Sequence, residues 1–110
     1  MNKRTGYEMP STTVRLVAAL CGDYIRMKEA LKREKSDQKK LTYFTYTYTI
    51  YDEIAKATGL VGCYVDVMIG DIADHKGYDK SELSGMLSRG KYYRGKTKAI
   101  YKIAEALFLY

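Results

Sequence analysis

The residues best suited to bind a ligand form a basic run near the C-terminus of the chain. Six basic side chains and no acidic one occur between positions 89 and 102: Arg89, Lys91, Arg94, Lys96, Lys98 and Lys102. Cations at this density neutralise phosphates, and side chains at the start of a helix can reach base edges in a DNA groove. Ser88 and Tyr92 lie with them at the predicted start of the last helix, where a recognition helix makes its contacts. These eight residues predict a nucleic-acid-binding helix; the alternative is an ordinary solvated, lysine-rich face.

A second group of ionisable side chains lies between positions 66 and 75. Its members are Asp66, Asp71, Asp74 and His75. Their spacing matches no established pattern of metal ligands, and we expect them to form a solvated helix face. The sequence also has no glycine-rich phosphate loop, nucleophile elbow or zinc-binding pattern. We therefore expect no metal, no cofactor and no enzymatic activity.

The aromatic composition is unusual, with twelve tyrosines, two phenylalanines and no tryptophan. Most tyrosines are expected to pack between helices with the hydroxyl group reaching the surface. Tyr43, Tyr46 and Tyr48 are the ones that we expect to be exposed, as a surface for a partner or for self-association. Stacking of tyrosines on unpaired bases is a further alternative, in which the protein would bind single-stranded nucleic acid.

Charge and length limit the class of protein. A chain of 110 residues suits one domain, and its net charge of +6 favours a polyanionic partner. The charge is segregated, because residues 52–82 hold seven acidic and three basic side chains while residues 26–40 and the last helix are basic. The apolar runs are too short for a membrane span, so we expect no membrane partner. Residues 1–10 do not resemble a secretion signal and are expected to be a flexible N-terminal arm.

The two cysteines indicate a reducing compartment. Cys21 and Cys63 are not in a C-x-x-C arrangement, and both lie beside apolar residues. We expect two buried, reduced thiols in a cytoplasmic protein.

Hydrophobic spacing predicts two long helices in the first half of the chain. The first, over 12–35, has a heptad-like stripe: Val17, Leu20, Tyr24, Met27 and Leu31. The segment 41–51 favours a strand by residue type, but its stripe recurs every three or four residues and no partner strand is evident. That stripe consists of Leu41, Phe44, Tyr48, Tyr51 and Ala55. We therefore favour a second helix over 38–58, packed on the first by facing stripes; a coiled-coil homodimer is the alternative.

Three further helices are predicted in the second half. One runs over 64–75, and a short one begins at Asp79, where Glu82 follows at capping-box spacing. Ser88, Arg89 and Gly90 then form a turn, and the last helix follows, weakened near its start by Gly90 and Gly95. Its predicted inward residues are Tyr93, Ile100, Ile103, Ala104 and Leu107. The prediction is an all-α single domain over 11–110, with an antiparallel helical hairpin at 11–58 and a three-helix, helix-turn-helix-like bundle at 63–110.

Several short motifs resemble a family of phage proteins. The most specific are the run GYDKSELSGMLSRGKYYRGK over 77–96 and the IAEAL ending over 103–107, with LTY at 41–43 and DE at 52–53. In these the chain is similar to small phage and prophage transcription regulators of Gram-positive bacteria, of the ArpU and RinA type. The resemblance implies an all-helical protein whose helix-turn-helix or sigma-factor-like C-terminal half binds DNA in the host cytoplasm. The matching site residues are Ser88, Tyr92, Tyr93, Arg94 and Lys96.

Two functions follow as expectations. The first is a DNA-binding transcription regulator of a phage or mobile element, whose last helix reads the major groove of double-stranded DNA. The second is a small phage-encoded protein that binds and inhibits or redirects a host nucleic-acid-handling protein, such as the host RNA polymerase. In the second, the tyrosine-rich helix would be the more important surface.

Overall fold

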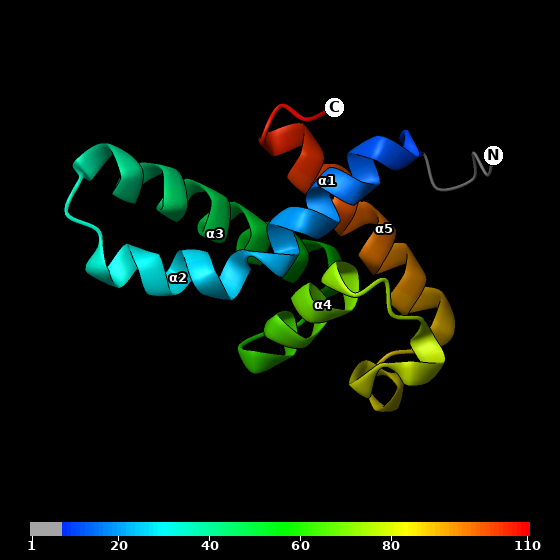
Figure 1. Ribbon diagram of the computed structural model, residues 1–110. Helices are drawn as coiled ribbons and strands as arrows, with labels where there is room; N and C mark the ends of the chain where they lie inside the picture. The colour runs from blue at the N-terminus through cyan, green and yellow to red at the C-terminus, as the bar shows by residue number, and fades with distance from the viewer. Residues whose placement is uncertain (1–7) are drawn as a thin grey trace.

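The computed structural model describes residues 8–110, and every regular element in that range is a helix (Figure 1). The elements, in chain order, are α1 (Ser11–Gly22), α2 (Tyr24–Arg33), α3 (Asp37–Thr58), α4 (Cys63–Ala73), the short 3₁₀ helices η1 (Tyr78–Lys80) and η2 (Glu82–Gly85), and α5 (Arg89–Ala106). The predicted all-α fold class is confirmed. Most of the predicted N-terminal arm, residues 1–7, lies outside the described residues.

The first predicted helix is two helices that meet at Asp23. The backbone of Asp23 has φ −94° and ψ 0°, which ends α1, and its N–H bonds to the carbonyls of Ala19 and Leu20. Its carboxylate accepts two hydrogen bonds of 2.6 Å from Arg26, in the first turn of α2. The prediction of one continuous helix was therefore wrong. Gly22 at the junction has no side chain to favour continued helical geometry.

The ambiguous segment 41–51 is helical and lies in the middle of α3. Threonine hydroxyls along it donate back to the carbonyl four residues earlier, from Thr42 to Gln38 and from Thr45 to Leu41. These bonds satisfy the hydroxyls within the helix, which lets a threonine-rich segment remain helical. Ser36 caps the start of α3, and Gly59 ends it with φ 76°, in the left-handed region that glycine favours.

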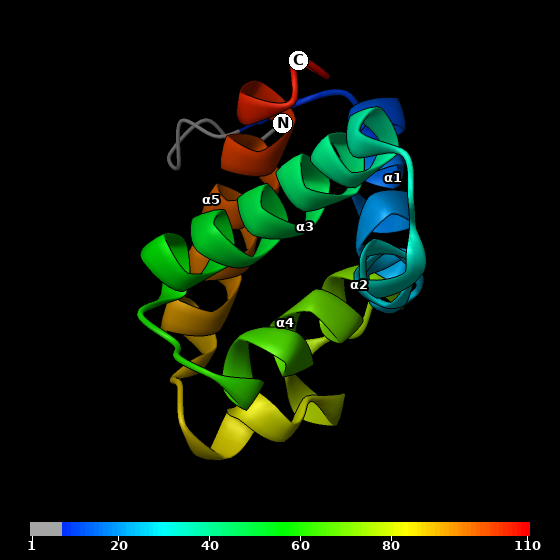
Figure 2. The ribbon, with the colours of Figure 1, turned by 90° about the vertical axis from the view of Figure 1, so that its left-hand side faces the viewer.

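α3 is the helix that connects the two predicted halves of the chain. It lies antiparallel to α2, with which it forms a hairpin that extends from the rest of the molecule (Figure 1). Its other half crosses α5, which is its most extensive contact, while α1 packs mainly on α4 (Figure 2). Ile50 and Ile54 of α3, Met68 of α4 and Ile103 of α5 are fully buried in one core. The two halves therefore share that core.

Gly95 permits the close crossing of α3 and α5. A Cβ atom at this position would lie 2.9 Å from Cγ2 of Thr58 and 3.4 Å from the carbonyl oxygen of Ala57. Such a contact is shorter than packed atoms tolerate, so any larger residue would push the helices apart. The glycine that weakens α5 as an isolated helix is needed for its packing.

The segment before α5 differs from the prediction. The predicted short α-helix from Asp79 is instead the two 3₁₀ helices η1 and η2, and Ser81, not Asp79, provides the side-chain cap of η2. The predicted turn at 88–90 is also wrong, because Ser88 is the N-cap of α5 and accepts a hydrogen bond from the backbone N–H of Lys91 at 3.3 Å. Residues 63–110 thus hold two α-helices joined by two 3₁₀ turns.

Candidate nucleic-acid interface

Three cations of the predicted site follow one side of α5, where Lys91 and Arg94 are exposed and Lys98 is half-buried in a depression that Glu53 and Glu105 also line. Lys91, Arg94 and Lys98 recur at intervals of three and four residues, so they lie on one side of the helix. The adjoining side carries its buried residues: Tyr92, Gly95, Ala99, Ile103 and Ala104. None of the three cations has an acidic partner within residues 8–110. We call these three residues the α5 stripe.

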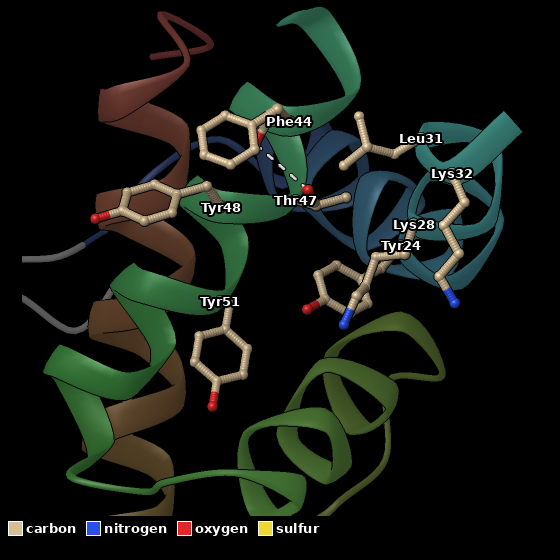
Figure 3. Close-up of a pocket in the computed structure, with 8 residues that line it drawn as sticks. All are labelled: Tyr24, Lys28, Leu31, Lys32, Phe44, Thr47, Tyr48 and Tyr51. Atoms are coloured by element: carbon tan, nitrogen blue, oxygen red, sulfur yellow. Dashed lines mark hydrogen bonds between the residues drawn. The ribbon is translucent and has the colours of Figure 1, made fainter. Parts of the chain in front are cut away.

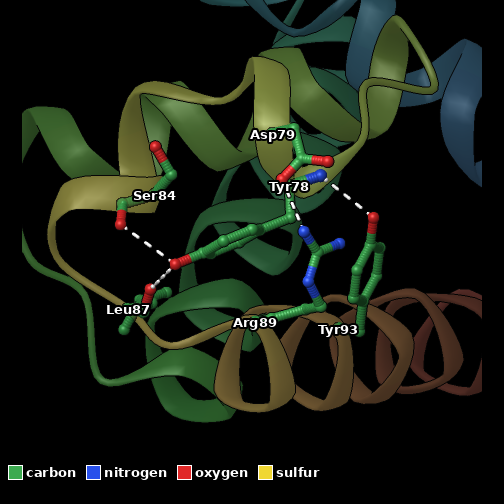
Figure 4. A network of polar contacts seen from close by, with 6 residues as sticks. All are labelled: Tyr78, Asp79, Ser84, Leu87, Arg89 and Tyr93. Atoms are coloured by element: carbon green, nitrogen blue, oxygen red, sulfur yellow. Dashed lines mark hydrogen bonds and ion pairs between the residues drawn. The ribbon is translucent and has the colours of Figure 1, made fainter.

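Arg89 begins α5 and is held by the preceding segment (Figure 4). Its guanidinium lies 2.5 Å from a carboxylate oxygen of Asp79 and 5.0 Å from the centroid of the Tyr78 ring. The hydroxyl of Tyr78 donates to the carbonyl of Leu87 at 2.7 Å. The backbone N–H of Tyr78 donates to the hydroxyl of Tyr93 at 3.0 Å. The ion pair is exposed on both sides and therefore weak. Breaking this ion pair therefore costs little free energy.

Tyr92, predicted to lie near bases, is 0% exposed. Its hydroxyl donates to Oδ2 of Asp71 at 2.9 Å and lies 3.2 Å from the carbonyl oxygen of Lys76. Burial, and then the Asp71 carboxylate, raise the pKa of the Tyr92 hydroxyl. Tyr93, predicted to point inward, is 40% exposed. The inward side of α5 is thus one residue out of phase with the prediction at its start, because Tyr92 aligns with Ala99 and Ile103.

The acidic cluster is divided between the surface and the interior. Asp66, Asp74 and His75 are exposed, as predicted, whereas Asp71 is buried and accepts a hydrogen bond of 2.5 Å from the hydroxyl of Ser81. The prediction of a solvated face was therefore wrong for Asp71, whose charge is compensated by two hydroxyl donors. Within residues 8–110, no three His, Cys, Asp or Glu side chains are gathered closely enough to hold a metal ion.

The remaining two lysines of the predicted site have partners within the protein. The ammonium of Lys96 donates to the carbonyl oxygen of Lys76 at 2.6 Å and lies 5.6 Å from the ring centroid of Tyr92. Burial lowers the pKa of Lys96, and the nearby Asp71 carboxylate partly opposes that shift. Lys102 forms an ion pair of 3.6 Å with Glu105. Among the residues that the structure describes, the cations of α5 without a bonded partner are therefore Lys91, Arg94 and Lys98.

The predicted tyrosine surface has a different composition. Tyr43 and Tyr46 are half-buried against the core, whereas Tyr48 is 56% exposed. The exposed neighbour of Tyr48 is Phe44, four residues earlier on α3, which the sequence assigned to the inter-helix stripe. The core residues of α3 are Thr47, Ile50 and Ile54. The buried side of α3 is thus displaced by one position from the predicted stripe. The spacing of four residues between Phe44 and Tyr48 is the sequence signal that the two rings lie side by side on the helix.

The cysteines are only partly as predicted. Cys21 is buried, and burial raises the pKa of its thiol to about 12, so it stays protonated at neutral pH. Cys63, predicted to be buried, is exposed because it is the first residue of α4 and lies beside the turn at Gly62. Among residues 8–110, no helix has both the length and the apolar character that crossing a membrane requires.

Comparison of the chain with protein-family models, curated proteins and solved structures finds no match. The resemblance to ArpU-type and RinA-type regulators therefore stays a prediction.

Proposed function

We propose that the protein binds double-stranded DNA through the α5 stripe, as a non-enzymatic regulator of a phage or mobile element. The observation that carries the proposal is the α5 stripe, in which Lys91, Arg94 and Lys98 share one helix face without an acidic partner in residues 8–110. Three such cations span about 10 Å of helix at 1.5 Å per residue. Phosphate contacts of this kind supply most of the affinity of DNA-binding proteins.

The start of α5 adds a second attraction for phosphate. The first backbone N–H groups of a helix are unpaired and carry partial positive charge, which favours anions at this end. Ser88 satisfies the N–H of Lys91, and Arg89 lies beside it in an exposed ion pair. In the proposed complex Ser88, Arg89, Lys91 and Arg94 are nearest the bases, and Lys98 contacts the backbone.

The buried contacts of α5 support the proposal by holding the helix rigid. Tyr92 and Lys96 bond to Asp71 and to the carbonyl of Lys76, so the helix is fixed to α4 and to the segment that follows it. We therefore assign both residues a positioning role, in place of the contacts with bases and phosphates expected from the sequence. A rigid helix loses little conformational entropy when it docks.

A selection of random double-stranded DNA at two salt concentrations tests the proposal. It should yield an enriched sequence, and binding should weaken as salt rises, because phosphate contacts release counterions. Loss of this enrichment in Arg94→Ala would indicate that α5 recognises the DNA sequence. Failure of the intact protein to bind any DNA at low salt would contradict the proposal.

A second candidate function is binding to a host protein that handles nucleic acid. The observation that favours it is the exposed aromatic pair of Phe44 and Tyr48 on α3, which lies in the hairpin and not on α5.

A further inference from the structure

We infer that the groove between α2 and α3 binds an acidic peptide segment that carries a large apolar side chain. The groove has a volume of about 340 Å³, and Figure 3 shows the side chains around it. Its lining residues are Tyr24, Lys28, Leu31, Lys32, Phe44, Thr47, Tyr48 and Tyr51. This site is separate from the α5 stripe and does not depend on DNA binding.

The walls of the groove are apolar and open to solvent. Phe44 and Tyr48 are 51% and 56% exposed, and their rings stack with centroids 5.6 Å apart and an interplanar angle of 19°. Tyr24 and Thr47 lie buried at the floor, and Leu31 lies on the α2 side. Exposed aromatic side chains that line a groove are a common feature of protein-binding sites. A leucine or aromatic side chain of a partner would bury these rings.

Two lysines at the groove set the charge of the partner. Lys28 has no acidic partner in residues 8–110, and its ammonium lies 5.4 Å from the ring centroid of Tyr24. Lys32 forms only a long ion pair of 3.5 Å with Glu29, in which both side chains are exposed. A carboxylate brought by a partner can therefore interact with both ammonium groups.

The hairpin that holds the groove carries a net positive charge. Residues 24–48 hold seven basic and three acidic side chains. The basic ones are Arg26, Lys28, Lys32, Arg33, Lys35, Lys39 and Lys40. A second copy of this chain would bring the same positive charge to the contact, and like charges facing each other disfavour association. An acidic segment complements that charge.

The shape of the groove fits a helix or a short turn of chain. It lies between two antiparallel helices, and grooves of this kind accept amphipathic helices through apolar anchors spaced three or four residues apart. The hydroxyl of Tyr51 is already used as an acceptor for the N–H of Gly62. The hydroxyl of Thr47 is likewise bonded, to the carbonyls of Tyr43 and Phe44. The exposed surface between the helices is dominated by the rings of Phe44 and Tyr48, which favours a large apolar side chain over a nucleobase.

A selection of random peptides displayed against the intact protein tests the inference. Enriched peptides should combine aspartate or glutamate with leucine or an aromatic residue. A labelled copy of one such peptide should lose at least about tenfold in affinity for the Phe44→Ala/Tyr48→Ala variant, as expected for loss of a buried anchor. It should also bind Lys28→Glu/Lys32→Glu more weakly than wild type.

Matched controls separate the groove from general effects. Ile25→Ala/Val61→Ala removes two apolar side chains that are 64% and 71% exposed outside the groove, and it should bind the peptide as wild type does. Arg15→Glu should likewise leave the affinity for the peptide nearly unchanged. The variant Lys91→Ala/Arg94→Ala/Lys98→Ala should also bind the peptide as wild type does, which keeps this test independent of DNA binding. Circular dichroism of each variant confirms that it is folded.

Three results would overturn the inference. The first is enrichment of basic or uncharged peptides, or of peptides that bind the groove variant as well as wild type. The second is displacement of the peptide by a single-stranded oligothymidine, with oligothymidine binding lost in Phe44→Ala/Tyr48→Ala, which would assign the groove to nucleic acid. The third is self-association in sedimentation experiments that the same variant abolishes, which would assign the groove to a second copy.

Discussion

The hydroxyl of Tyr92 on α5 lies 2.9 Å from the Oδ2 atom of Asp71 on α4, and both side chains are buried. The hydroxyl of Ser81 donates to the same oxygen at 2.5 Å, so one carboxylate joins two helices and the segment between them. A carboxylate enclosed in this way is costly to leave without its donors. The pair therefore fixes the orientation of α5, and with it the direction in which the α5 stripe faces.

Replacing Tyr92 by phenylalanine should lower the free energy of unfolding by about 1–3 kcal/mol, because Asp71 loses a buried donor. Tyr93→Phe is the matched control, since its hydroxyl accepts only one exposed hydrogen bond, from the N–H of Tyr78. Urea unfolding followed by circular dichroism measures both. A Tyr92→Phe protein as stable as wild type would show that the hydroxyl has no structural role.

Alkaline pH should destabilise the protein in part through Tyr92. The pKa of Tyr92 is raised in the folded state, so its contribution to stability is present below the ordinary tyrosine value of about 10 and is lost as pH rises above it. Tyr24, whose pKa burial raises to about 12, acts in the same direction. The free energy of unfolding should be lower above pH about 10 than below it. This decrease should be smaller in Tyr92→Phe than in wild type. An equal fall in both proteins would contradict this assignment.

Gly95→Ala should destabilise the protein by about 1–3 kcal/mol, because its Cβ would lie 2.9 Å from Cγ2 of Thr58. Gly90→Ala is the control, since only the mobile end of the Arg94 side chain is near, and better helix propensity should stabilise it by up to about 1 kcal/mol.

Thr58→Ser combined with Gly95→Ala should recover much of the lost stability. Serine removes Cγ2 but keeps the hydroxyl that donates to the carbonyl of Ile54 and accepts from the N–H of Leu60. A double-mutant cycle by urea unfolding measures the coupling. Strict additivity would show that the clash is not at Thr58.

Arg94→Ala should weaken binding to a selected DNA site by about 1–3 kcal/mol if the guanidinium makes a bidentate base contact. Arg94→Lys keeps the charge but loses the bidentate geometry, so it should bind unrelated DNA like wild type and the selected site less well. Fluorescence anisotropy with both DNAs measures this. An equal loss on every sequence in Arg94→Ala would make Arg94 a phosphate contact only.

The fold could be predicted where hydrophobic spacing was strong. Segment 41–51 is helical because its apolar residues recur every three to four positions and threonine hydroxyls bond within the helix. The break at Asp23 could not be predicted from the stripe, because Tyr24 and Met27 are buried in the structure just as a continuous helix predicts. Local spacing describes one face of a helix but does not show where its backbone is interrupted.

The candidate site was less predictable, because its decisive contacts join residues distant in sequence. Asp71 bonds to Ser81 and to Tyr92, which lie ten and twenty-one residues away. Nothing in the local sequence shows that Tyr92 and not Tyr93 has a buried acceptor. Likewise, the sequence shows Gly95 only as a weak helix former. Its close approach to Thr58, thirty-seven positions earlier, is visible only in the structure. Exposed Lys91 and Arg94, which need no partner, were placed correctly on the surface.

The salt dependence of DNA affinity tests the central proposal most directly. Wild type, the stripe variant Lys91→Ala/Arg94→Ala/Lys98→Ala, and the hairpin variant Lys35→Ala/Lys39→Ala/Lys40→Ala are compared on one duplex, the two variants having lost equal charge. The slope of log affinity against log salt should be smaller in the stripe variant by at least about 0.9, the value for the one phosphate contact of Lys98, and nearly unchanged in the hairpin variant. Equal slopes for the two variants, or no DNA binding by wild type at low salt, would contradict a DNA-binding face on α5.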